Sequence, residues 1–67
     1  MNTGDKDKLR ILLSYWIEHN KEHSGEFREW AEKAVDFGGE AVHGDMLSAA
    51  QYMDKATESL LKALEKS

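Results

Sequence analysis

The chain has no cysteine and no proline, and it carries no long hydrophobic run. Without cysteine there is no disulfide framework, zinc ribbon, thiol nucleophile or dithiol redox centre, and nothing indicates an oxidising compartment. The longest apolar run, Ile11-Leu12-Leu13, is far shorter than the ~18 residues of a membrane span. The first residues also lack the basic and apolar pattern of a secretion signal. We therefore expect a cytoplasmic protein that does not act in a membrane.

Basic residues are scarce as well. The sequence has 9 Lys and Arg against 13 Asp and Glu, which gives a net charge of -4 at pH 7. No basic patch stands out, so nucleic acid is not an expected partner. A chain of this length buries only about 60% of the surface that it exposes when unfolded. We expect one helical domain over residues 5–67 after a disordered tail at residues 1–4, with no large active-site cleft.

Apolar residues recur at helical spacing in two stretches, residues 9–17 and 27–35. At 100° per residue, the apolar stripe keeps its phase from one stretch to the other, across Ser24-Gly25. An interior glycine costs only ~1 kcal/mol relative to alanine. A helix that runs through Ser24-Gly25 and a chain break there are both compatible with the pattern.

Gly38-Gly39 predicts a turn, because two residues without a Cβ readily adopt the positive φ angles that end a helix. A further amphipathic helix is expected from about Glu40 to Glu65, with Gly44 interrupting its start. The predicted fold is all-α, a three-helix up-down-up bundle with a break at Ser24-Gly25. The alternative, without a break, is a long helical hairpin that dimerises into a four-helix bundle.

The predicted core follows the apolar stripes of these helices. Its members are Leu9, Leu13, Trp16, Phe27, Trp30, Ala34, Val42, Met46, Met53, Leu60 and Leu64.

One weak chemical signal is a pair of histidines, His19 and His23. Four residues apart on a helix, two imidazoles share a face at a spacing that can chelate one transition metal. Glu26 lies on the same flank and makes a third candidate ligand for Zn, Ni or Co. A carboxylate of the last helix would complete the site: Asp54 in the three-helix fold, or Glu58 in the hairpin.

The remaining histidine does not fit this site. His43 follows the expected turn closely, so a rise of 1.5 Å per residue puts it roughly 20 Å or more from His19. Asn20 stands where the zinc-protease signature has glutamate, so protease chemistry is not supported. The alternative to a metal site is that the two rings pack beside the apolar stripe and bind nothing.

No catalytic constellation is present, and we do not expect an enzyme. The interpretation that we favour is a small interaction or accessory protein of unknown function, with no cofactor, whose partner is another protein or a second copy. A divalent-metal-binding protein is the alternative.

The segment from Trp16 to His23 has the pattern W-x-E-H-N-x-x-H. It resembles a family of short, uncharacterised, all-helical prokaryotic proteins. The resemblance implies no activity. Members often have histidine at the position of Tyr15 and alanines at Ser24-Gly25; the first difference weakens the metal interpretation, and the family alanines favour a helix through that segment.

Overall fold

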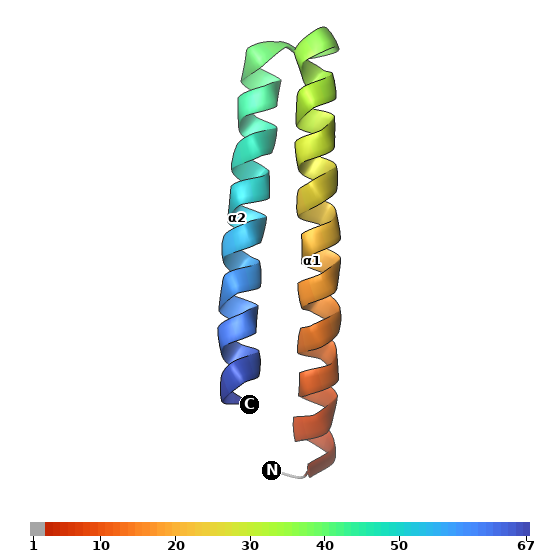
Figure 1. Ribbon diagram of the computed structural model, residues 1–67, viewed down its shortest axis with the longest axis vertical. Coiled ribbons are helices and arrows are strands. Elements are labelled where there is room, and N and C mark those ends of the chain that lie inside the picture. The colour runs from red at the N-terminus through yellow and green to blue at the C-terminus, as the bar shows by residue number, and fades with distance from the viewer. Residues whose placement is uncertain (1–2) are drawn as a thin grey trace.

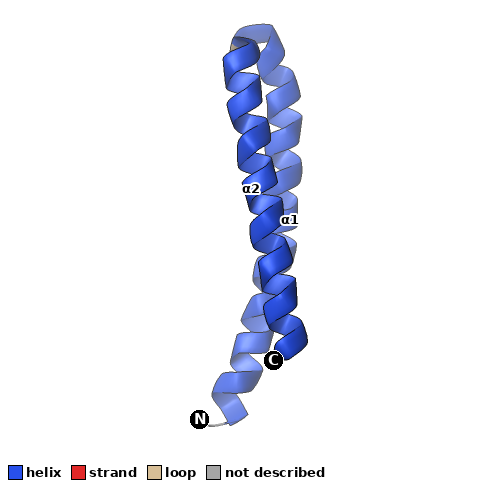
Figure 2. Cartoon of the chain, turned by 90° about the vertical axis from the view of Figure 1, so that its left-hand side faces the viewer, coloured by secondary structure: helices blue, strands red, loops and turns tan. Residues whose placement is uncertain are grey.

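The computed structural model describes residues 3–67 as two antiparallel α-helices. Helix α1 spans Thr3–Phe37 and helix α2 spans Gly39–Lys66. The turn lies at one end of the hairpin and both termini at the other, where α1 extends past α2 (Figure 1). Seen from the side, α2 lies in front of α1 over most of its length (Figure 2). The molecule is therefore a rod of 52 × 14 × 13 Å, one helix thick.

The prediction of a three-helix up-down-up bundle is wrong, because α1 continues through Ser24-Gly25 without a break. Ser24 is buried against α2, where its hydroxyl donates to Asp54 Oδ1 at 2.5 Å. Gly25 lies on the exposed side with no neighbour near its missing side chain. The tertiary contact of Ser24 offsets the small helix penalty of Gly25. The hairpin alternative describes the fold.

The predicted turn is confirmed at Gly38 and Gly39. Gly38 N–H donates to the Ala34 carbonyl at 2.6 Å, and Gly39 has a φ of +79°. A side chain would be strained at that φ, which explains the second glycine. Helix α2 then runs without interruption through Gly44. At the other end, α1 already includes Thr3 and Gly4 of the expected tail, and residues 1–2 lie outside the described part of the chain.

The contact between the helices is made of small side chains. Apart from Leu13 and Ile17, the buried residues among those described are alanine, serine or threonine: Ser24, Ala31, Ala34, Ala50 and Thr57. Small residues let two helix backbones approach closely, but they remove little apolar surface from water. The core is consequently thin.

The predicted core is only partly buried. Leu13 and Ala34 are buried, and Phe27, Met46, Met53, Leu60 and Leu64 are half-buried. Leu9, Trp16, Trp30 and Val42 are exposed by 40% or more. Their apolar character was recognised correctly, but the hairpin has no third helix to cover them. No helix in the described part of the chain has the length and apolar character needed to cross a membrane.

We expect substitution to alanine to have opposite effects at Gly25, inside α1, and at Gly39, in the turn. Gly25→Ala should raise stability by up to ~1 kcal/mol, because alanine favours the helix and its Cβ meets open space. Gly39→Ala should lower stability by about 1 kcal/mol, because of the positive φ. Thermal unfolding followed by circular dichroism at one protein concentration should show shifts of roughly 4–8 °C in opposite directions. A Gly39→Ala variant as stable as the parent would contradict the turn geometry.

Candidate functional site

Helix α1 carries two apolar seams rather than one. The inner seam advances in alternating steps of four and three and faces α2. Its members are buried or half-buried: Leu13, Ile17, Asn20, Ser24, Phe27, Ala31 and Ala34. Steps of three and four repeat the 3.5-residue period with which one helix face packs on a neighbour. This seam accounts for the hairpin.

A second seam, which we call the outward stripe, follows the same rule on the adjacent face of α1. It consists of Leu9, Leu12, Trp16, His19, His23, Trp30 and Phe37, with Glu26 and Lys33 at the two intervening positions. Trp16 is 40% exposed, Trp30 49% and Phe37 73%. Within residues 3–67 most of the stripe is exposed and only Leu12 and His23 are half-buried, although its period is that of a buried helix contact.

Helix α2 adds a row of smaller residues on the same side of the hairpin: Val42, Ala49, Ala56 and Ala63, seven residues apart. Arg28 and Asp54 pair across the helices on the opposite side. At 100° per residue this pair fixes which flank of each helix lies on which side. The outward stripe and the small row together form one largely apolar surface, the outward face, which His19, His23, Glu26 and Lys33 interrupt.

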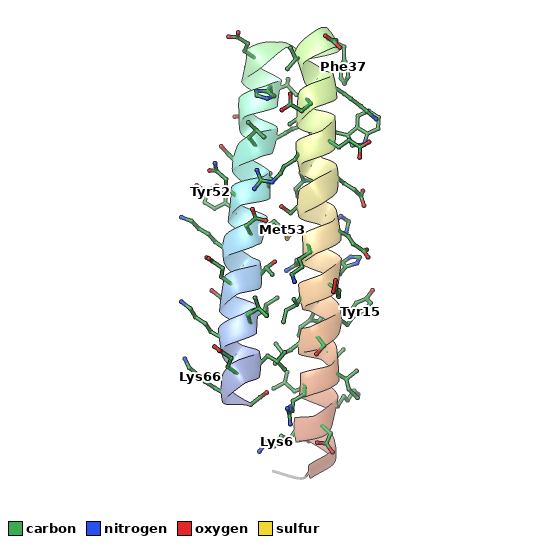
Figure 3. The ribbon with its side chains drawn as sticks, in the orientation of Figure 1. Lys6, Tyr15, Phe37, Tyr52, Met53 and Lys66 are labelled. Atoms are coloured by element: carbon green, nitrogen blue, oxygen red, sulfur yellow. The ribbon has the colours of Figure 1, made fainter. Side chains whose placement is uncertain are left out.

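His19 and His23 lie at the middle of the outward stripe. Their Nε2 atoms are 2.9 Å apart, so one imidazole donates a hydrogen bond to the other, and the rings meet edge to face with centroids 4.3 Å apart. Tyr15 stacks on His19 at 5.5 Å and Phe27 lies 6.0 Å from His23. Tyr15 points away from α2, whereas Met53 points between the helices (Figure 3). The result is a column of four rings along α1.

The other candidate ligands do not join the pair in this chain. Asp54 is held by Ser24 and Arg28, on the side of the hairpin opposite the histidines. Glu58 is exposed on α2 at about the same angular position as Asp54. Glu26 is exposed beside the pair. Within residues 3–67, no group of three or more His, Cys, Asp or Glu side chains is placed to hold a metal ion.

His43 is separate from this pair, as expected. It lies near the turn with Nε2 at 3.9 Å from the Glu32 carboxylate.

The cluster of Ser24, Arg28 and Asp54 was missed at the sequence level. The hydroxyl of Ser24 donates to Asp54, and so does the Arg28 guanidinium. These two hydrogen bonds, with that from Ser24 the larger cause, lower the pKa of the Asp54 carboxyl below its ordinary 3.8. The available signal was Ser24 itself, because it falls on the inner seam, where an unpartnered hydroxyl is costly.

The comparison with protein-family models gives one match, a domain of unknown function, DUF8180, over residues 9–67. The chain belongs to this family. The family match covers α2 entirely and all of α1 except its first turns, including the outward stripe. It agrees with the expected resemblance to an uncharacterised family. The chain matches no curated protein and no solved structure.

The lowered pKa of Asp54 predicts pH-dependent stability. A carboxylate whose pKa is lower in the folded state stabilises the fold above its unfolded pKa, and this contribution is lost as pH falls through the folded value. The melting temperature of the parent should therefore exceed that of Asp54→Asn at pH 6, and the difference should shrink below pH 3.8 and disappear once the pH lies below the folded pKa.

A matched control tests the cause of this effect. In a Ser24→Ala background, Asp54→Asn should produce a smaller change at pH 6, because the larger of the two hydrogen bonds is already absent. Equal effects in both backgrounds would show that Ser24 does not stabilise the carboxylate.

Proposed function

We propose that this protein is a small helical interaction protein that associates with a second copy of itself through the outward face. Two hairpins stacked on this face form a four-helix bundle, in which each helix has two neighbours. The interface is isologous, with the same surface contributed by both copies. Each seam of α1 then has a neighbour.

The observation that carries this proposal is the accessible surface of the chain. A compact monomer of 7.6 kDa exposes about 4,300 Å² by the usual size scaling. This chain exposes 5094 Å². The excess of roughly 800 Å² equals the area that each partner buries in a standard stable interface. Binding a second copy would therefore bury about as much surface as this chain exposes in excess of a compact protein of the same mass.

The shape supports the same conclusion. The radius of gyration is 15.7 Å, against about 11 Å for a compact domain of this length. A rod one helix thick has no interior for its tryptophans, whereas a bundle two helices thick has one. Bulky aromatic side chains in such numbers on one face are typical of an interaction surface.

Further expectations belong to this proposal. We place the protein in the cytoplasm, because its sequence uses no cysteine. We propose neither an enzymatic activity nor a nucleic-acid partner. The W-x-E-H-N-x-x-H segment contributes Trp16, His19 and His23 to the outward stripe, and we propose it as the functional signature of the prokaryotic members of the family.

Two substitutions that introduce a glutamate on α1 test the association. Trp16→Glu should raise the dissociation constant of the dimer more than about 100-fold, since losing a buried tryptophan costs roughly 3 kcal/mol per copy. Ile11→Glu is the matched control, because Ile11 is 70% exposed and lies outside the outward stripe, on the side of α1 turned away from α2. Sedimentation equilibrium should give twice the chain mass for the parent and for Ile11→Glu.

Two results would contradict the proposal. The first is a parent chain that stays folded and monomeric at concentrations near 1 mM, where even weak self-association is populated. The second is an equal loss of mass in both variants, which would mean that the outward face is not the contact.

A further inference from the structure

We infer that His19 and His23 from two copies of the chain form one divalent transition-metal site with four imidazole ligands, at the centre of the dimer. The inference rests on the proposed self-association, and it names the ligand that the outward face takes. Zn²⁺, Co²⁺ and Ni²⁺ are the ions that suit imidazole donors.

The distance between the two histidines is suited to chelation. With Zn–N bonds of 2.0–2.1 Å, two nitrogens on one tetrahedral zinc lie about 3.3 Å apart. The two Nε2 atoms already converge to 2.9 Å, so a small rotation of each side chain admits the ion between them. The hydrogen bond that now joins the rings is replaced by two bonds to metal.

One chain supplies only half of such a site. Two imidazoles leave two positions of a tetrahedral ion unfilled, and the described part of the chain brings no third ligand to the pair. A second copy offers the same pair by symmetry. Four neutral imidazoles then complete the coordination.

The position of the pair along the rod favours this arrangement. Helix α1 runs from Thr3 to Phe37, so its midpoint is Asn20, between His19 and His23. When two rods overlap almost fully with their turns at opposite ends, a two-fold axis that crosses α1 at residue 21, one residue from this midpoint, sets each His19 level with His23 of the other copy, on the facing helix.

The alternative arrangement, with both turns at the same end, is less favourable for these residues. It places α1 against α2 of the other copy, where Ala49, Tyr52 and Ala56 stand near the level of the histidines. Alanine methyl groups offer the ring nitrogens no partner, and the Tyr52 hydroxyl offers a hydrogen bond but no second pair of metal ligands. In the arrangement with opposite turns, each imidazole instead faces another imidazole.

The charges around the pair also favour a cation. Glu22 and Glu26 flank the histidines on the exposed side of α1, and each chain has a net charge of -4. Bringing two copies together sets these carboxylates near one another. A divalent ion at the axis reduces this repulsion, and the ring N–H groups that do not face the ion can donate hydrogen bonds to these carboxylates.

Titration of the full chain with Co²⁺ and Zn²⁺ tests the site. We expect one ion per two chains, the visible absorption of tetrahedral Co²⁺, and a dimer dissociation constant lowered at least about 10-fold by Zn²⁺ in sedimentation. The variant His19→Ala/His23→Ala should bind at least about 100-fold more weakly, and His19→Gln/His23→Gln should do the same with less change in packing. His43→Ala is the control and should bind as the parent does.

A spin-labelled variant measures how the two copies are aligned. The chain has no cysteine, so a single spin label at Glu40→Cys, beside the turn, reports the distance between the two turns. Turns at opposite ends should lie apart by nearly the 52 Å length of the rod. A label-to-label distance below about 25 Å would place the turns at one end and overturn the shared site.

The outcomes separate the two proposals. A dimer that binds no ion, or binds equally in the histidine variants, overturns the metal site and leaves the association intact. One ion per chain also overturns the shared site. A folded monomer that binds no ion overturns both.

Discussion

A helix with two apolar seams needs two neighbours, and a hairpin supplies one. This constraint governs the rest of the structure. The inner seam of α1 is satisfied by α2, and the outward stripe is left facing water with Trp16 at 40% and Trp30 at 49% exposure. The hydrophobic stabilisation scales with the apolar area removed from water. A two-helix rod therefore gains only part of the stabilisation that its apolar side chains could give. In the proposed dimer, association through the outward face supplies the rest.

The distribution of side-chain volume follows from the same constraint. The contact between α1 and α2 uses Ala31, Ala34 and Ala50, which are almost completely buried, while the tryptophans lie outside it. A monomeric domain normally places its largest apolar residues at the centre, where they bury the most area. Here the small residues set a close spacing within each hairpin. In the proposed dimer, the large ones fill the wider space between two hairpins.

Much of this architecture was predictable from the sequence, and the reason for each error is physical. The phase of the stripe across Gly25 was compatible with a continuous helix and with a break, because helix periodicity is local and does not count the neighbours of a helix. Whether the chain breaks at Ser24-Gly25 depends on a contact with Asp54, thirty residues from Ser24. The hydrogen bond to Asp54 satisfies the Ser24 hydroxyl on the inner seam. The core prediction treated both seams as one broad stripe. It therefore placed Leu9, Trp16 and Trp30 in an interior that one chain does not have.

The histidine pair shows what sequence and structure each contribute to the candidate site. Spacing alone placed His19 and His23 on one face, and the structure adds that their Nε2 atoms converge at 2.9 Å in the middle of an apolar stripe. Polar groups in such a seam reduce stability unless they form hydrogen bonds or bind a metal ion. They therefore favour an alignment of the two chains in which such a partner is present. Hydrophobic residues on their own would accept several alignments of two rods. In the proposed dimer the central imidazoles distinguish among these alignments, because the one with turns at opposite ends sets each ring beside an imidazole of the other copy that can share a metal ion.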